Sequence, residues 1–305
     1  MSQAVLSDKR GERVRRPQVA LESTLVAFGM PYPRSIEVGW KLARAVRSAG
    51  AEPKTLALID GQVCVGLHDH ELERIASGDD VVKLNASDLG PAMALGLTGA
   101  TTVSATCALA HGAGIQVFAT GGIGGVHRDA EHTYDESQDL TALARYPVAV
   151  VSSGAKSILD LPKTLERLET LGVPIIGYRT NEFPAFYARR SGLHVAHRVD
   201  DVGVLARVVL AHWRMHPRMG ILIVNPIPEE HALGADEVAG HIEAALAAAH
   251  VEGIRGKKLT PWLLARLEAL TEGRSVEANI ALAESNARLA GELSVALHEL
   301  HEDAA

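Results

Sequence analysis

The segment YPVAVVSSGAKSILDLPKTLERLETLGVPIIGY, residues 146–178, reads as a strand, a helix and a second strand in succession. The apolar run Val148–Val151 predicts a buried strand, and 173–178 predicts another. Between them, Asp160 can cap a helix whose first turn holds Pro162. The leucines of that helix recur every three or four residues and predict one buried stripe: Leu161, Leu165, Leu168 and Leu171. A strand, helix and strand in this order favour a parallel sheet covered by helices.

The rest of the chain continues this alternation. Further strands are predicted within 19–28, an apolar run rich in β-forming residues, and at 80–85, 115–120 and 219–228. Asp60-Gly61 between the apolar runs of 55–67 predicts a hairpin. Helices are predicted after residue 34, over 70–77, over 87–99, after 102, over 200–216 and at about 235–250, 261–271 and 277–300. We therefore expect an α/β fold, an α-β-α sandwich with a mainly parallel sheet, a small β-hairpin and C-terminal helices. We expect one catalytic domain over 18–305, after a disordered leader over 1–17.

Composition excludes several classes of function. The chain has 305 residues and a formal net charge of -7, which argues against a nucleic-acid binder. Two cysteines, Cys64 and Cys107, cannot build a disulfide framework, look structural, and favour a reducing cytoplasm. No apolar run reaches the length of a membrane span, and the charged first residues are not those of a secretory signal.

Polar residues follow most of the predicted strands. Because ligands of open α/β sheets bind at the carboxyl ends of the strands, these residues are the first candidates for a site. They are Glu22 with Ser23 and Thr24, Lys83, Thr101 and Thr102, the segment 121–139, Lys156, and Asn225.

The segment ATGGIGGVHR, residues 119–128, holds four glycines in five residues. Its backbone N–H groups could form a nest for a phosphate, and a mobile surface loop is the equal alternative. It matches neither the dinucleotide-binding fingerprint nor a phosphate-binding loop that ends in Gly-Lys-Ser/Thr. His127 stands out among the 14 histidines because it follows this loop.

The next residues, HRDAEHTYDESQDL, combine two histidines with several carboxylates. Such a set could hold a hard divalent cation such as Mg²⁺ or Mn²⁺. A solvated acidic turn is the alternative, since the spacing matches no zinc signature.

Three charged residues at strand ends could carry chemistry. Glu22 ends an apolar strand, and a carboxyl group partly removed from water holds a proton more readily, which suits a proton donor. Of Lys83 and Lys156, one could bind a phosphate and the other could attack a carbonyl or anomeric carbon to give an imine. Structural ion pairs or capping contacts are the alternatives for all three.

Seven motifs occur in the order found in pseudouridine-5′-phosphate glycosidases. The chain resembles that family from about residue 18 to about 300 through ALEST…GMPYP, GATTVSAT, FATGGIGGVHRDAEHTYDESQDL, SSGAKSILDL, NEFPAFY, NPIPEE and SVEANIAL. The resemblance implies reversible cleavage of pseudouridine 5′-phosphate to uracil and ribose 5-phosphate, a divalent cation that is usually Mn²⁺, and a homotrimer.

The resemblance also implies residue roles. Lys156 would be the nucleophile at the ribose C1′, Glu22 the proton donor and Asp135 the metal ligand. Asn279 would reach the uracil. The remaining expected substrate contacts are Lys83, Val103, Ser137, Gln138 and Asp139, to which we add Thr120 and His127 of the glycine-rich segment.

The chain departs from the family pattern at two places. After Lys83 the family commonly has two arginines, whereas this chain reads LNASDL, with Ala86 and Ser87 nearest those positions. Ser152 and Ser153 replace a usual Cys-Ala before the lysine motif. Two other readings therefore stay open: a lyase acting on another C-nucleotide or modified pyrimidine nucleotide, and a silent sugar-phosphate sensor.

Overall fold

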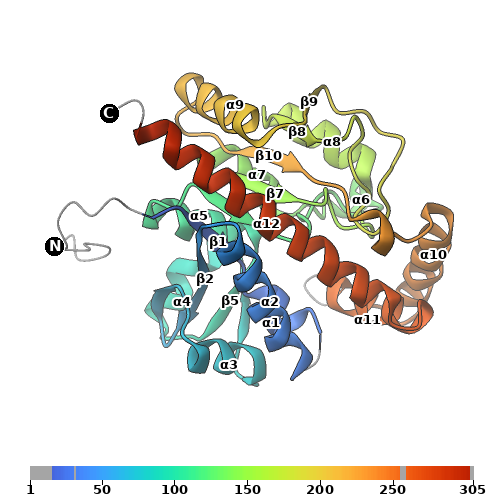
Figure 1. Cartoon of the computed structure of the whole chain (residues 1–305). Coiled ribbons are helices and arrows are strands. Elements are labelled where there is room, and N and C mark those ends of the chain that lie inside the picture. Colours follow the sequence, from blue (N-terminus) through green and yellow to red (C-terminus); the bar gives the residue numbers. More distant parts are fainter. Residues whose placement is uncertain (1–15, 31, 255–258, 303–305) are drawn as a thin grey trace.

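The computed structural model describes residues 16–30, 32–254 and 259–302, with only the backbone for residues 260 and 261. Within these ranges ten strands form one mixed sheet (Figure 1). They are β1 (Gln18–Leu21), β2 (Glu52–Ile59), β3 (Gln62–Val65), β4 (Val82–Leu84), β5 (Gly99–Thr101), β6 (Val117–Ala119), β7 (Ala149–Ser152), β8 (Ile175–Tyr178), β9 (His197–Val199) and β10 (Ile221–Val224). The expected leader falls almost entirely on residues that lie outside the described ranges.

The strand order is β4-β5-β2-β1-β6-β7-β10-β8-β9, and β3 pairs with β2. From β2 through β9 along this order, neighbouring strands are parallel. The chain runs from β1 to β2 in one direction along the sheet and from β6 to β7 in the other. The carboxyl ends of β1 and β6 therefore meet at the point where the order reverses, which is where ligands bind in such sheets.

The predicted hairpin is confirmed, and it extends the sheet. Asp60 and Gly61 adopt φ of 50° and 74°, as this tight turn requires. The first half of β2 pairs with β1, and its second half runs past the end of β1 to pair with β3 and β5. Because β5 lies antiparallel to β2, the carboxyl ends of β4 and β5 return toward the carboxyl end of β1.

Helices cover both faces of the sheet. The longest, α12 (Arg274–Glu302), crosses β1, β6 and β7 and packs against α2 (Arg34–Ser48) and α9 (Val202–Met215) (Figure 1). On the other face, α5 (Val103–Ala113) packs against α7 (Gln138–Arg145). The other helices are α1 (Thr24–Phe28), α3 (Asp69–Ser77), α4 (Leu89–Ala94), α6 (Ala130–Thr133), α8 (Leu161–Thr170), α10 (Ala235–Val251) and α11 (Leu259–Leu270).

The expected α-β-α sandwich is confirmed. None of the helices in the described ranges is both long and apolar enough to cross a membrane.

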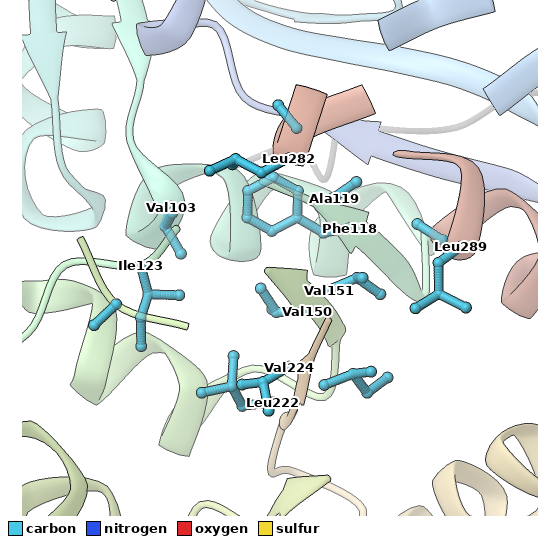
Figure 2. Close-up of a cluster of buried hydrophobic side chains, with 14 of the residues drawn as sticks. Val103, Phe118, Ala119, Ile123, Val150, Val151, Leu222, Val224, Leu282 and Leu289 are labelled. Carbon is cyan, nitrogen blue, oxygen red and sulfur yellow. The ribbon is translucent and has the colours of Figure 1, made fainter. Parts of the chain in front are cut away.

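The central strands form the core with α12. Phe118, Val150 and Leu222 of β6, β7 and β10 are fully buried. Figure 2 shows them in one cluster with Leu282 and Leu289 of α12. Because this core holds the strands in register, the loops after their carboxyl ends start from fixed positions.

One predicted strand end was confirmed and one predicted helix end was wrong. The strand within the apolar run 19–28 ends at Leu21, so Glu22 stands at its end as expected, and Thr24–Phe28 form α1, because the Ser23 carbonyl accepts the N–H groups of Val26 and Ala27. The helix predicted over 87–99 ends at Ala94. Gly96 has a φ of 67°, and the next residues turn into β5.

Candidate active site

A cavity of about 330 Å³ lies beyond the carboxyl ends of the central strands. Its volume suits a small metabolite. The predicted site residues that line it are Glu22, Lys83, Val103, His127, Asp135, Ser137, Gln138, Asp139, Lys156 and Asn279. Thr120 was also expected to contact substrate, but it is not among the lining residues. The cavity thus joins segments that are more than 250 residues apart in the chain.

Glu22 is held by two threonine hydroxyls. Its Oε1 accepts a hydrogen bond from Thr120, and its Oε2 accepts one from Thr24. Glu22 is 8% exposed, so nearly all of its contacts are with protein. Thr120 therefore supports Glu22 from below, whereas Thr24 lines the cavity itself. Sequence reasoning placed Thr24 at a strand end but gave it no role.

The neighbouring Ser23 fixes where β1 ends. Its hydroxyl donates to the carbonyl of Leu56 at 2.6 Å, and the same carbonyl accepts the Thr101 hydroxyl at 2.8 Å. The Thr101 N–H in turn donates to Ser23 Oγ at 2.9 Å. All three residues are buried. This network joins the ends of β1 and β5 and so sets the position of Glu22 relative to Lys83 and Thr102.

The glycine-rich segment is packed rather than an open nest. The N–H groups of Ile123, Gly124 and Val126 bond to the Gly154 carbonyl, the Asp139 carboxylate and the Thr164 hydroxyl. A Cβ on Gly124 would lie 2.3 Å from Ser137 Oγ, and one on Gly125 would lie 2.4 Å from Thr164 Oγ1. These two glycines allow close approach of side chains, and neither has a positive φ. Of the two interpretations of this segment, the phosphate nest is therefore not available at these three N–H groups, because protein acceptors already bind them.

Asp139 ties this segment to the start of α5. Its Oδ1 accepts the Ser104 N–H and its Oδ2 accepts the Gly124 N–H, both at 2.8 Å. The carboxylate is 4% exposed and stays compatible with burial because both oxygens are hydrogen-bonded. Asp139 also lines the cavity. Its two hydrogen bonds to backbone N–H groups show that it holds the glycine-rich segment in place.

Lys156 follows β7 through a constrained turn. Gly154 has a φ of 78°, and a Cβ there would lie 2.3 Å from the carbonyl oxygen of Pro184. The Lys156 N–H bonds to the Ile123 carbonyl at 3.0 Å, and the Leu159 N–H bonds to the Lys156 carbonyl at 3.0 Å. The backbone is thus fixed while the half-buried side chain lines the cavity. The lysine does not lie on a solvated helix face.

Charged groups of both signs surround His127. Burial lowers the pKa of this imidazole; Asp135 opposes the shift, and the positive charges of Lys156 and Lys83 add to it. Both lysines and Asp135 are therefore close enough to His127 to act on it electrostatically. The two lysines give this part of the cavity positive charge, which suits an anionic group.

The acidic segment does not form a protein cage for a metal. In the described ranges no group of three or more His, Cys, Asp or Glu side chains is placed to hold one ion. Glu136 pairs with Arg167 at 2.8 Å. Asp135 lines the cavity, and its carboxylate is the one protein ligand that we assign to a cation. This donor set fits a hard cation that keeps several waters and binds substrate oxygens, as Mg²⁺ and Mn²⁺ do.

Sequence reasoning missed the buried amide network beneath the site. Asn286 of α12 is fully buried, and its Nδ2 donates to the Thr120 carbonyl at 2.9 Å and to Ser153 Oγ at 3.1 Å. Its Oδ1 accepts Nδ2 of Asn225 at 3.0 Å. The ends of β6, β7 and β10 are thereby joined to one side chain. An asparagine among the apolar positions of a long helix was the available signal.

Known proteins resemble this chain over nearly its whole length. The family model described as "Indigoidine synthase A like protein" matches residues 9–296. The chain belongs to this family. A family member from Caldanaerobacter subterraneus subsp. tengcongensis, named pseudouridine-5′-phosphate glycosidase, is 52% identical over 95% of this chain and 94% of its own length. One from Myxococcus xanthus with the same name is 51% identical, over 94% and 95% of the two chains.

Solved structures of the indigoidine synthase A-like family share the fold. The prealnumycin C-glycosynthase AlnA, in complex with ribulose 5-phosphate, superposes with a TM-score of 0.88 at 43% identity, over 94% of both chains. An indigoidine synthase A-like protein from Thermotoga maritima gives a TM-score of 0.87 at 36% identity, over 94% of this chain and 95% of its own.

Both departures from the family pattern lie beside the site. Ser87, near the position of a missing arginine, accepts Nε2 of Gln138 at 2.8 Å. Ser153 donates to the Asn225 carbonyl at 2.9 Å and so belongs to the Asn286 network. In this member of the indigoidine synthase A-like family, Ser87 therefore bonds to a residue that lines the cavity, whereas Ser153 belongs to the network beneath it.

Proposed function

We propose that the protein is a pseudouridine-5′-phosphate glycosidase. It would reversibly cleave the C–C glycosidic bond of pseudouridine 5′-phosphate to uracil and ribose 5-phosphate, with residues 18–305 acting as one catalytic domain. The observation that carries this proposal is that Lys156 and Glu22 line one cavity with Lys83. Relatives about half identical over nearly the full length bear that name, which supports the same substrate.

Lys156 would supply the nucleophile. A C–C glycosidic bond has no leaving heteroatom to protonate, so hydrolysis by two carboxylates is unsuitable. The Lys156 amine attacks C1′ and displaces the ring oxygen, which takes up the proton that the nitrogen loses and becomes a hydroxyl. The sugar is then an open-chain amine. The nitrogen lone pair then forms an imine as the C1′–C5 bond breaks, and the bonding pair goes to uracil C5. Water hydrolyses the imine and releases ribose 5-phosphate.

Glu22 would supply the proton that uracil C5 takes as the bond breaks. Its carboxyl group is held by Thr24 and Thr120, so its orientation is fixed before substrate binds. In the synthetic direction the same group, as a carboxylate, takes the C5 proton after C5 has attacked the imine. A silent sensor would need neither Glu22 nor Lys156.

The two ends of the substrate would meet different walls. Lys83 and His127, which both line the cavity, would bind the phosphate. Asn279 of α12 lines the cavity and is 7% exposed, and its Oδ1 has no hydrogen-bond partner in the described part of the chain. An N–H group of uracil would supply that partner. AlnA binds a pentose phosphate, which supports the sugar phosphate as the shared part of the ligand.

Asp135 would hold a divalent cation, Mn²⁺ or another of its kind, together with waters. The cation would supply positive charge against the substrate phosphate. Dialysis against a chelator should abolish turnover, and added Mn²⁺ should restore it. Asp135→Asn should raise the Mn²⁺ concentration needed for half-maximal activity, whereas Asp129→Asn, at an exposed position of the same loop, should not. Full activity in the presence of the chelator would show that the reaction needs no divalent cation.

We also propose that the protein assembles as a homotrimer in the cytoplasm. Four exposed apolar residues support a subunit contact where α4 ends and β4 and β5 begin: Val82, Met93, Leu95 and Leu97, between 37% and 71% exposed. Light scattering coupled to gel filtration should give three times the mass of one chain. A monomer at micromolar concentration would reject the trimer.

Two measurements test the reaction itself. Mixing uracil, ribose 5-phosphate and Mn²⁺ with the protein should convert uracil to pseudouridine 5′-phosphate, detected by mass after chromatography. Adding borohydride to protein with ribose 5-phosphate should leave a stable mass adduct on Lys156. An adduct without formation of pseudouridine 5′-phosphate would indicate another base, and the absence of both at every metal concentration would reject the function.

A further inference from the structure

A second hollow adjoins the active-site cavity on the side of α11 and α12. This side cavity, of about 270 Å³, is formed by the end of α1, Tyr187, α11 and the start of α12. Four residues line both hollows: Phe28, Gly29, Leu264 and Asn279. The two spaces therefore meet along one border, and Asn279 stands on it.

Two residues of this border, Gly29 and Asn279, bear on what could bind there. Gly29 ends α1, and a Cβ at this position would lie 2.3 Å from the Leu25 carbonyl oxygen. No side chain larger than hydrogen fits there without moving the helix, so Gly29 adds only backbone to the border. The unpartnered Oδ1 of Asn279 is the second feature, since a buried acceptor without a bond in the protein favours a ligand that donates one.

An aromatic pair links the walls of the two hollows. The rings of Phe186 and Tyr187 pack edge to face with centroids 4.7 Å apart. Phe186 lines the active-site cavity, and Tyr187 lines the side cavity. Ala27, Met30 and Val276 add apolar surface to the side cavity, and Glu268 contributes a carboxylate. Such walls favour apolar groups over further charged ones.

We propose that the side cavity is an extension of the base subsite and takes an apolar substituent carried on N1 of the pyrimidine. This rests on the proposed function, in which C5 of the base bonds to the ribose. C5 must therefore be free. We assign N3–H as the donor to Asn279, because an N1 that carries a substituent has no hydrogen to donate. N1 is the remaining ring nitrogen that can carry a substituent toward the border.

The test compares uracil with 1-propyluracil as the base coupled to ribose 5-phosphate, with product detected by mass. Each methylene buried in an apolar space lowers KM by roughly fourfold. We expect the wild-type protein to couple both bases and to show a KM for 1-propyluracil at least about tenfold below that for uracil.

Ala265→Leu fills the side cavity from α11 without adding to the lining of the active-site cavity. It should raise the KM for 1-propyluracil by about tenfold and leave the KM for uracil within about twofold. Ala269→Leu is the matched control, because Ala269 lies one turn further along the same helix, is exposed like Ala265, and lines neither hollow. It should change neither value.

The outcomes separate the two proposals. Coupling of uracil but not of 1-propyluracil, equal KM values for the two bases, or an equal loss of both substrates in Ala265→Leu would overturn the extended subsite alone. Failure of the wild-type protein to couple uracil would overturn the proposed function and the subsite with it.

Discussion

The hydroxyl of Thr120 donates a hydrogen bond to Oε1 of Glu22, although 98 residues separate the two in the chain. Glu22 follows β1 and Thr120 follows β6, and these strands are neighbours at the point where the strand order reverses. Thr24 holds the other carboxylate oxygen. The candidate proton donor is thus fixed by two strands and not by its own loop alone.

Replacing Thr120 with valine should impair turnover more than it impairs folding. The methyl group keeps the shape but leaves a buried carboxylate oxygen without its donor, at a cost of about 1–3 kcal/mol. We expect kcat to fall by about tenfold, while borohydride still traps ribose 5-phosphate on Lys156. Thr120→Ser, which keeps the hydroxyl, should retain most of the activity. An unchanged kcat in Thr120→Val would show that this bond does not position Glu22.

Lys156→Ala should keep the fold and abolish turnover together with the borohydride adduct. The backbone of residue 156 is held by its bonds to Ile123 and Leu159, which do not need the side chain. Circular dichroism and thermal unfolding would check the fold. Lys163→Ala is the control: this exposed lysine pairs with Glu131 and Asp160 outside the cavity, so activity should persist. Turnover near the wild-type rate in Lys156→Ala would refute the assignment of Lys156 as the nucleophile.

Asp139→Asn should destabilise the protein. One oxygen that now accepts a backbone N–H becomes an NH₂ group, so two donors face each other in a buried site. We expect the free energy of unfolding to fall by about 1–3 kcal/mol, measured by urea denaturation. Asp129→Asn serves as the exposed control and should shift it by less than about 0.5 kcal/mol. Equal stability of the two variants would mean that the amide bonds of Asp139 contribute little.

The two cysteines should differ in their reaction with iodoacetamide. Burial raises the pKa of the Cys107 thiol well above its ordinary value, and the nearby Asp139 and Glu22 charges add to this shift. Because the thiolate is the reactive form, Cys107 should stay unmodified in the native protein and react in urea. Burial also raises the pKa of the half-buried Cys64, so Cys64 should react slowly but first. Rapid native labelling of Cys107, located by peptide mass mapping, would contradict its burial.

Local patterns predicted most of the architecture. The spacing of leucines over 161–171 predicted α8, and Asp60-Gly61 predicted the hairpin, because helix periodicity and turn conformation depend on residues close together in the chain. Glu22, Lys83 and Lys156 could likewise be chosen as candidates, because their positions at the ends of predicted strands depend on residues close together in the chain. The network that joins the ends of β1 and β5 was not predicted, because Ser23 binds Leu56, a partner 33 residues away that no local pattern contains.

The sequence by itself determined the alternation of strands and helices, the motifs of the family, and the residue types at the carboxyl ends of the strands. Only the tertiary structure decided which of these residues share a cavity and what holds them there. It assigned Thr120 to Glu22, Asp139 to the amides of two separate segments, and Asn286 to three strand ends. Hydrogen bonds of this kind join groups that approach each other only when the sheet has formed, so their partners cannot be found from spacing along the chain.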